Sequence, residues 1–328
     1  MSYAGAVDSA RRRLDVVKGH GTRNDFVLVD DQAGALDLTD DLVRALADRR
    51  GGVGGDGVIR LVASSGLAEG QAALAEDPAA TWFMDYRNAD GSIAQMCGNG
   101  VRVLAVLCAR LGLWTGEELV LGTRAGVRRV RAVAAPAWLD DEEADEPGEG
   151  EPWYEVTMGP VTVSDSAQAG EDEVVVAGLH VPRPGLGVDV GNPHTVVALP
   201  DADTLARADL RTEPQVTPAP SGGVNVELVV PLGERLCGAE LVGRVSMRVY
   251  ERGVGETESC GTGAVAAAAA VRAWAGDGAP ATWLVEVPGG LLRVSFDPDG
   301  TARLAGPAVL VADVTVDLAA LGRPTARR

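Results

Sequence analysis

The sequence contains few of the residues that build metal sites and disulfide frameworks. Its 328 residues include four cysteines and three histidines. The cysteines form no Cys-x-x-Cys pair, and the histidines are scattered along the chain. We therefore expect neither a disulfide scaffold nor a metal site.

Basic residues are also scarce, with 29 Lys and Arg against 47 Asp and Glu, which gives a net charge of −18. A nucleic-acid partner is not expected, because binding would need a basic surface to neutralise phosphates. No apolar run approaches the roughly 20 residues of a membrane span. No apolar block follows the basic residues within 1–13, so we expect no signal peptide and a cytoplasmic location.

Two motifs nearly repeat each other, at 97–100 (CGNG) and at 260–263 (CGTG). Each runs into an apolar segment that predicts a helix, over 101–111 and over 264–275. A cysteine at a helix start meets free backbone N–H groups and the positive end of the helix dipole, which favour thiolate. Two such cysteines suggest a pair that acts on one substrate from opposite sides. The alternative is two structural cysteines, buried at helix starts or joined in a disulfide.

The predicted strands and helices indicate an α/β (α+β) protein. Strands, a helix that begins at a cysteine, and further strands occur in this order twice. This order indicates an internal duplication. A helix capped by Thr39 and Asp40 is predicted through residue 47. Cys108 is predicted to be a core residue and Cys237 to lie in a loop. Strands are predicted at 26–30, 57–63, 81–86, 119–122, 127–133, 153–158, 174–181, 195–199, 224–230, 243–250, 282–287, 291–296 and 301–304.

Three segments predict loops. Residues 134–152 are acidic and rich in proline, and residues 211–223 combine proline and glycine with polar residues. Residues 52–57 (GVGGDG) satisfy the letters of G-x-G-x-x-G, which in dinucleotide-binding folds follows a strand and opens a helix. Here a helix precedes the motif and a strand follows it, so we predict a tight loop and no nucleotide.

Several stretches resemble the diaminopimelate epimerase family, and they occur in the family's order between about residue 18 and about residue 316. Beside the two cysteine motifs, they lie at 21–26 (GTRNDF), 88–92 (NADGS), 191–194 (GNPH), 224–225 (VN) and 250–257 (YERGVGET). A single C-G-x-G would be a weak signal, but the whole set is specific.

The resemblance implies a particular fold. Two pseudo-symmetric α/β domains are expected, each a mixed sheet or barrel wrapped around a central helix, with the active site in the cleft between them. The first domain would comprise 1–160 and 305–328 and carry Cys97. The second would comprise 161–304 and carry Cys260, and 134–152 would be an acidic insert.

The resemblance also implies a reaction, the cofactor-independent interconversion of LL- and meso-2,6-diaminopimelate for lysine and peptidoglycan precursors. In the LL direction Cys97 as thiolate would accept the α-proton, and Cys260 as thiol would deliver one to the opposite face. His194 and Glu251 match catalytic positions that tune the two thiols.

The substrate-binding positions follow in the same way. The backbone amides of Gly98, Asn99, Gly261 and Thr262 would hold the α-carboxylate between two helix N-termini. Other positions that match the family's binding residues are Asn24, Asn88, Asn192, Asn225, Glu251 and Arg252.

The chain departs from the family pattern at three places. Gly57 stands where some members carry a glutamine that touches substrate, and Arg23 stands where glycine is common. Ala312 aligns with a tyrosine that some relatives carry at a dimer contact, so the expectation of a homodimer stays open.

Four other functions compete with the epimerase. They are a racemase of the same fold for another amino acid, a phenazine-type isomerase that uses an acidic residue, a small-molecule binding protein, and a dithiol redox protein. The paired cysteines disfavour the second and third. The absence of Cys-x-x-Cys disfavours the fourth, and Asn88, Asn225 and Arg252 disfavour the first.

Overall fold

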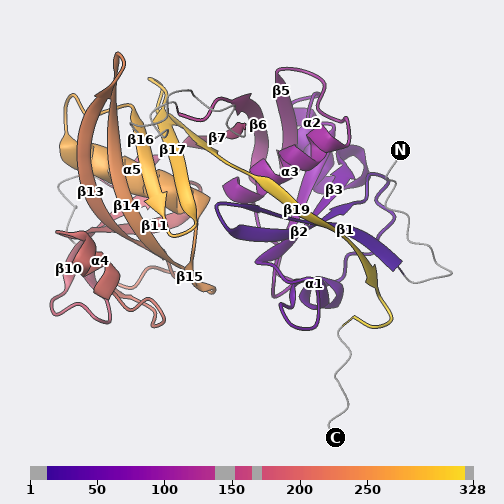
Figure 1. The fold of residues 1–328 in the computed structure, drawn as a ribbon, viewed down its shortest axis with the longest axis horizontal. Helices are drawn as coiled ribbons and strands as arrows, with labels where there is room; N and C mark the ends of the chain where they lie inside the picture. Colours follow the sequence, from indigo (N-terminus) through magenta and orange to yellow (C-terminus); the bar gives the residue numbers. More distant parts are fainter. Residues whose placement is uncertain (1–12, 137–151, 165–171, 322–328) are drawn as a thin grey trace, which may run out of the picture. The chain divides into compact units, whose positions relative to one another are not determined.

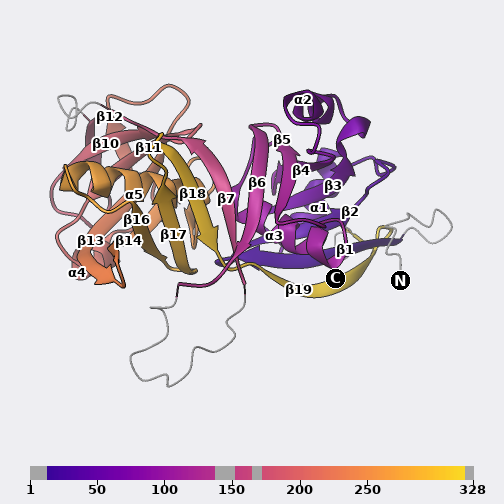
Figure 2. The same ribbon diagram turned by 90° about the horizontal axis from the view of Figure 1, so that it is seen from above.

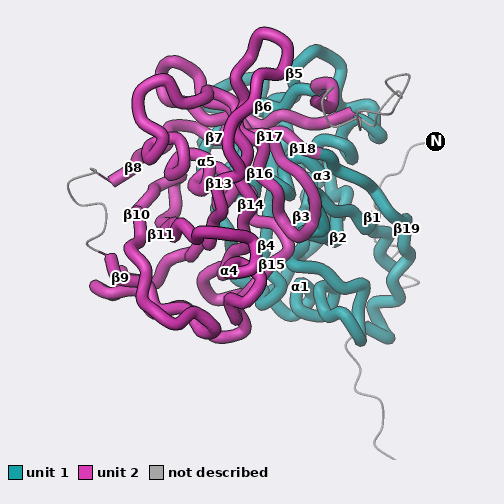
Figure 3. Tube along the Cα trace, turned by 60° about the vertical axis from the view of Figure 1, so that its left-hand side comes forward, with its two compact units in different colours: residues 1–132, 307–328 teal, residues 133–306 magenta. Residues whose placement is uncertain are grey.

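The computed structural model describes residues 13–136, 152–164 and 172–321. The chain divides into two compact units (Figure 3). Unit 1 comprises Met1–Ala132 and Pro307–Arg328, and unit 2 comprises Val133–Gly306. Residues 137–151 of the predicted acidic insert lie outside the described residues.

The strands of unit 1 pair in the order β19-β1-β2-β3-β4-β5-β6. Pairing is parallel between β2 and β3 and between β4 and β5, and antiparallel elsewhere in this order. The strand bounds are Arg13–Gly21 (β1), Asn24–Asp30 (β2), Gly57–Ala63 (β3), Trp82–Asn88 (β4), Glu118–Thr123 (β5), Gly126–Val133 (β6) and Val309–Asp317 (β19).

Helix α3 (Gly98–Arg110) makes the crossover from β4 to its parallel neighbour β5 and packs on β1, β2, β3 and β19 (Figures 1 and 2). Most of its apolar side chains are buried because strands reach it from several directions. The other helical elements of unit 1 are α1 (Asp40–Ala47), η1 (Ser64–Gly66) and α2 (Ala68–Glu76).

The strands of unit 2 pair in the order β7-β18-β17-β16-β14-β13-β11-β10-β8. Strand β15 pairs with β14, and β9 pairs with both β10 and β12. The strand bounds are Trp153–Pro160 (β7), Thr162–Val163 (β8), Asp172–Val175 (β9), Arg183–Asp189 (β10), Pro193–Ala198 (β11), Gln215–Thr217 (β12), Asn225–Cys237 (β13), Glu240–Glu251 (β14), Gly255–Thr257 (β15), Thr282–Val287 (β16), Gly290–Phe296 (β17) and Thr301–Gly306 (β18).

Helix α5 (Gly261–Ala275) occupies the core of unit 2, where it contacts β8, β10, β11, β13, β14, β16, β17 and β18 (Figure 1). Its run of alanines from Ala266 to Ala270 is buried, because small side chains let strands approach closely on several sides. The unit also contains the short helix α4 (Ala202–Arg207).

The two units repeat one succession of strand pairings. Read from β19 in unit 1 and from β8 in unit 2, the first six pairings are antiparallel, antiparallel, parallel, antiparallel, parallel and antiparallel. In both units a cysteine-capped helix makes the second parallel crossover, α3 from β4 to β5 and α5 from β14 to β16. The same order of elements in two units supports the duplication that the twin motifs indicate.

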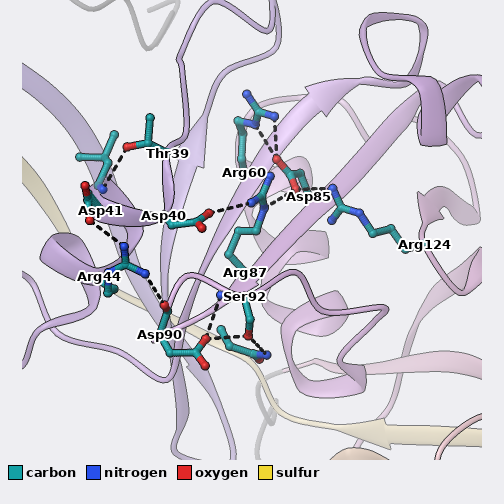
Figure 4. A network of polar contacts seen from close by, with 12 residues as sticks. Thr39, Asp40, Asp41, Arg44, Arg60, Asp85, Arg87, Asp90, Ser92 and Arg124 are labelled. Atoms are coloured by element: carbon teal, nitrogen blue, oxygen red, sulfur yellow. Dashed lines mark hydrogen bonds and ion pairs between the residues drawn. The ribbon is translucent and has the colours of Figure 1, made fainter.

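A buried ion cluster holds β4 in place within unit 1 (Figure 4). Asp85 is fully buried, and its carboxylate pairs with Arg60 at 2.6 Å, Arg124 at 2.8 Å and Arg87 at 3.3 Å. Burial alone would raise the pKa of Asp85, but the surrounding guanidinium groups lower it. This carboxylate is therefore ionised in the core and fixes the strand that ends at Asn88.

The structure confirms most of the predicted elements and corrects three predictions. The predicted strand 174–181 is wrong beyond β9, and β10 supplies the neighbouring strand instead. The predicted loop 211–223 contains β12, whose Val216 is buried against β9. Cys237 ends the long hairpin strand β13 and does not lie in a loop. Pairing with a partner strand decides all three cases, β9 with β10 and β12 and Cys237 with Glu240 across the β13–β14 hairpin.

Two departures from the family pattern lie at the turn that contains Arg23 and at the start of β3. Thr22 and Arg23 join β1 to β2 with φ values of 49° and 62°, the left-handed region that favours glycine. A side chain at Gly57 would place its Cβ 2.4 Å from the Arg87 carbonyl oxygen and 2.6 Å from the Tyr86 ring. Glycine is therefore the residue that fits this strand pairing.

Candidate active site

Cys97 and Cys260 are the N-cap residues of α3 and α5. Each Sγ accepts a hydrogen bond at 3.4 Å from a backbone N–H in the first helical turn, that of Gly100 and that of Gly263. The helices begin at Gly98 and Gly261, three residues before the predicted starts. The position of both cysteines at helix N-termini is thereby confirmed, and each thiol lies where the helix dipole favours negative charge.

The second glycine of each motif lies against the ends of neighbouring side chains. A Cβ at Gly100 would lie 2.8 Å from the Met84 side chain. A Cβ at Gly263 would lie 2.8 Å from the Glu227 carboxylate oxygen Oε1. The repeated Cys-Gly-x-Gly therefore reflects two helix N-termini that are each tightly enclosed by their own unit.

In unit 1, a chain of polar contacts runs from Cys97 to a buried arginine. The Cys97 thiol donates to Asn24 Oδ1 at 3.5 Å, and this oxygen also accepts from Asn99 Nδ2 at 3.2 Å. The Arg102 guanidinium donates to Asn99 Oδ1 at 2.8 Å and to the Gly98 carbonyl at 3.4 Å. The structure thus brings together Asn24, Cys97 and Asn99, as predicted, and adds Arg102.

Arg102 is completely buried in α3. Burial lowers the pKa of Arg102 to about 10, while the nearby Cys97 acts in the opposite direction. A desolvated cation is stabilised by a neighbouring anion, so the same attraction favours the Cys97 thiolate. Arg102 is one of two charged residues in an otherwise largely apolar helix, and the sequence analysis gave it no role.

A hydrogen bond to Asp56, which belongs to the glycine-rich loop 52–57, orients the side chain of Asn24. The Asn24 Nδ2 donates to Asp56 Oδ2 at 2.7 Å, so the Asn24 carbonyl must face Cys97 and Asn99.

Ion pairs hold Asp56 and its neighbours in place. Arg49 bridges Asp56 and Asp25, and Lys18 pairs with Asp25 and the Gly54 carbonyl. Burial raises the pKa of Asp25, but Arg49 and Lys18 outweigh it and bring the value to about 2. The loop that matches G-x-G-x-x-G therefore supports Asn24.

Asn88 ends β4 and closes the turn to Ser92. Its Nδ2 donates to Ser92 Oγ at 3.0 Å, and Ser92 Oγ donates to Asp90 Oδ1 at 2.6 Å (Figure 4). The side-chain amide of Asn88 is thus fixed by the tight turn of its own segment, whereas Asn24 and Asn99 are tied to Cys97.

In unit 2, Cys260 lies at the end of a longer chain of contacts. The Cys260 Sγ lies 3.5 Å from Thr262 Oγ1, which accepts from Asn192 Nδ2 at 3.4 Å. The Asn192 Oδ1 is 3.1 Å from His194 Nε2, and His194 Nδ1 is 2.7 Å from Glu227 Oε1. The predicted residues Asn192, His194, Cys260 and Thr262 are therefore joined in one network.

Cys260 has a different electrostatic environment from Cys97. Burial, Glu251 and Glu227, in that order of importance, raise the pKa of the Cys260 thiol well above its ordinary value. The hydrogen bonds from Thr262 and Gly263 lower it but do not compensate. Cys260 is therefore a thiol at neutral pH.

Asn225 and Arg252 are joined in unit 2, because Asn225 Oδ1 accepts from the Arg252 backbone N–H at 2.9 Å. Asn225 lies opposite His194 in the pairing of β13 with β11. The Arg252 guanidinium donates to the Gly222 carbonyl at 3.0 Å. Glu251 accepts a hydrogen bond from the Thr257 hydroxyl. These contacts hold the carboxylate and the guanidinium of neighbouring residues at one end of β14.

The sequence analysis gave no role to two residues of these networks, Asp56 and Glu227. Glu227 interrupts an apolar strand sequence, and this interruption was the available signal. As for bound groups, residues 13–136, 152–164 and 172–321 contain no cluster of three or more His, Cys, Asp or Glu suited to a metal ion. Within the same residues, no helix has the length and apolar character to cross a membrane.

Comparison with known proteins decides the family. A sequence model described as diaminopimelate epimerase matches residues 16–139 and 187–311. The chain belongs to the diaminopimelate epimerase family. The diaminopimelate epimerase of Streptomyces coelicolor is 43% identical over 314 residues, which cover 94% of this chain and 96% of the relative. That of Mycolicibacterium smegmatis is 45% identical over 306 residues, covering 92% and 96%.

Solved structures agree with a mixed α/β fold of the diaminopimelate epimerase family. A phenazine biosynthesis protein of the PhzF family from Bacillus anthracis aligns with a TM-score of 0.61 at 15% identity, over 93% of this chain and 99% of that one. A hydroxyproline epimerase from Agrobacterium vitis aligns with a TM-score of 0.55 at 14% identity, over 93% and 91%. At such low identity the likeness concerns the fold alone.

Proposed function

We propose that this chain interconverts LL- and meso-2,6-diaminopimelate, with Cys97 and Cys260 as the two acid–base groups. Membership of the diaminopimelate epimerase family supports the reaction, a step in lysine and peptidoglycan precursor biosynthesis. The observation that carries the two-thiol mechanism is the unequal environment of two cysteines in matched positions. A buried cation lies near Cys97, and the carboxylates of Glu251 and the buried Glu227 act on Cys260.

The proton transfers balance within the two thiols. In the LL direction the Cys97 thiolate removes the α-proton and becomes a thiol. The carbanion then takes a proton from the Cys260 thiol on the opposite face, which leaves a Cys260 thiolate. Inversion at one carbon needs an acid and a base on opposite faces, and the reverse reaction exchanges the two roles. No electron transfer and no cofactor enters this scheme.

Stabilisation of the carbanion must come from the protein. We assign the α-carboxylate to the first-turn amides of the two helices, those of Gly98, Asn99, Gly261 and Thr262. Oriented N–H groups at a helix N-terminus offer positive potential to the charge that develops next to the carboxylate. This assignment uses both glycines that follow the cysteines, because a residue without Cβ lets the carboxylate approach the backbone.

The distal amino and carboxylate groups distinguish diaminopimelate from simpler amino acids. We assign their recognition to the side chains of Asn24, Asn88, Asn192, Asn225, Glu251 and Arg252. Amides, a carboxylate and a guanidinium supply donors and acceptors for both groups of a zwitterion. The predicted cleft between two pseudo-symmetric domains, the homodimer and the cytoplasmic location stay predictions.

Proton exchange tests the proposal directly. The protein is incubated in deuterated water with LL-diaminopimelate, a reducing agent and no added cofactor, and the products are followed by NMR. We expect meso product that carries deuterium at the inverted carbon. Cys97→Ala and Cys260→Ala should each abolish it, with a loss of at least about 100-fold, whereas Cys108→Ala serves as the matched control. Normal turnover by either active-site variant would refute the two-thiol mechanism.

A further inference from the structure

Glu227 of β13 is a buried titratable residue that the proposed mechanism does not use. Its side chain has no solvent exposure, and Oε1 contacts His194 Nδ1 at 2.7 Å. Its second oxygen, Oε2, has no hydrogen-bond partner among the described residues. A carboxylate is expensive to bury, so a position that retains one needs a compensating charge.

Two features favour the ionised form of Glu227. The carboxylate lies against the first turn of α5, since a Cβ at Gly263 would lie 2.8 Å from Oε1. The positive end of the helix dipole therefore stabilises negative charge there. In addition, the 2.7 Å contact to His194 has the length of a charge-assisted hydrogen bond.

His194 accordingly has an acceptor at each ring nitrogen. Nδ1 faces the Glu227 carboxylate at 2.7 Å, and Nε2 faces Asn192 Oδ1 at 3.1 Å. With Glu227 ionised and Asn192 Oδ1 turned toward the ring, both neighbours are satisfied when both nitrogens carry hydrogen, because a bare ring nitrogen would oppose an oxygen lone pair. The ring is then an imidazolium that balances the Glu227 anion.

This protonation state fixes the direction of the remaining hydrogen bonds. With its Oδ1 accepting from His194, Asn192 presents Nδ2 to Thr262 Oγ1 at 3.4 Å. The Thr262 oxygen accepts from that amide, so its own proton is available to the Cys260 Sγ at 3.5 Å. A thiolate at Cys260 would therefore meet a hydroxyl donor.

We propose that Glu227 is a positioning residue of the epimerase: its buried carboxylate keeps both ring nitrogens of His194 protonated and so turns the Asn192–Thr262 relay with a donor toward Cys260. The inference deepens the proposed role of Cys260 and rests on that role for its kinetic consequence. The donor stabilises the thiolate that Cys260 becomes when it delivers its proton. With a neutral His194 the Asn192 amide could turn, and the Thr262 hydroxyl would then donate to Asn192 instead of to Cys260.

Other charged groups near Cys260 could also change the ionisation of its thiol. They are Glu251 from β14, Glu227 from β13 and, through Glu227, His194 from β11. Glu251 acts on the thiol directly, and its carboxylate accepts a hydrogen bond from the Thr257 hydroxyl. The substitution Glu227→Gln changes the carboxylate that contacts the His194 ring itself.

The first test uses the native protein and needs no substrate. The imidazole ¹⁵N signals of His194, assigned among three histidines with a His194→Gln variant, show which ring nitrogens carry hydrogen. We expect both to be protonated near neutral pH. In Glu227→Gln, which keeps the size of the side chain but removes its charge, the ring should lose a proton at lower pH than in the native protein.

The second test is kinetic. Glu227→Gln should lower kcat roughly tenfold near neutral pH, equivalent to one pH unit of ionisation. Its kcat relative to the native enzyme should rise as the pH falls through the new His194 midpoint, which a packing defect would not produce. Glu227→Asp, which keeps the charge, should restore part of kcat. Glu286→Gln, which removes a surface carboxylate paired with Arg244 in the same unit, is the matched control.

The proposal is overturned if one ring nitrogen of native His194 lacks hydrogen near neutral pH, or if Glu227→Gln leaves the His194 titration unchanged. The ¹⁵N measurement on the native protein decides the matter even if the variant does not fold. A native protein without epimerase activity would contradict the proposed function instead, and the ¹⁵N result would still stand or fall by itself.

Discussion

Arg102 of α3 and Val265 of α5 occupy the same position in two helices, the fifth residue after the capping cysteine, and both are completely buried. One position carries a desolvated cation and the other an apolar side chain. The two motifs look alike in sequence, but the helices that follow them give their thiols different electrostatic surroundings.

Residues on the strands add to this difference in the electrostatic surroundings of the two thiols. The polar contacts of Cys97 lead through Asn24 and Asn99 to the Arg102 guanidinium. Those of Cys260 lead through Thr262, Asn192 and His194 to the Glu227 carboxylate. The buried cation near Cys97 favours a thiolate in unit 1, whereas burial of Cys260 and the direct effect of Glu251 and Glu227 on its thiol favour the protonated form in unit 2.

Removing the buried cation should suppress ionisation of Cys97. In Arg102→Gln we expect roughly a tenfold loss of kcat/KM near neutral pH, because a larger share of Cys97 stays protonated. Alkylation of Cys97 by iodoacetamide, followed by peptide mass spectrometry, should need a higher pH. Arg102→Lys should preserve both properties in part. Arg110→Gln, on the same helix but paired with Asp313, is the control, and equal alkylation in Arg102→Gln would contradict the prediction.

Removing a carboxylate near Cys260 should have the opposite effect on that thiol. Burial, Glu251 and Glu227 raise the pKa of Cys260, so the thiol persists as the pH rises, and activity in the LL direction persists with it. Glu251→Gln removes one of these causes. The alkaline limb of kcat/KM against pH should therefore move to lower pH, whatever happens to KM. Glu256→Gln, which loses a carboxylate paired with Arg248, should leave the limb in place.

Cys108 should make the protein less stable in alkali. Burial raises the pKa of Cys108 from 9.0 to about 12. The unfolded thiol ionises first as the pH rises, so this contribution to stability is complete below about pH 9 and is lost between about pH 9 and pH 12. At about pH 10 the loss is about 1.4 kcal/mol relative to pH 8.

Urea unfolding of the native protein and of Cys108→Ala at these two pH values measures the effect. The variant should lose about 1.4 kcal/mol less than the native protein between them, although its stability at the lower pH is reduced by the missing side chain. An equal pH dependence in both proteins would show that Cys108 does not ionise in this way.

Local patterns were enough to predict the elements that depend on neighbouring residues. The cap at Thr39, the helices after Cys97 and Cys260, and the strands β3 and β16 all follow from apolar periodicity and helix-capping residues. Strand β10 (RPGLGVD) did not, because proline and glycine disfavour strands and only pairing with β11 and β9 makes it one.

The sequence by itself determined the pair of cysteines at two helix starts, the duplicated order of elements and the family resemblance, because these depend on residues close together in the chain. Only the tertiary structure decided which charge each thiol experiences. Glu227 meets His194 through the parallel pairing of β11 with β13. Arg102 is buried in α3, on which β1 and β19, from opposite ends of the chain, pack. Electrostatic effects depend on distance and burial in space, and sequence spacing gives neither.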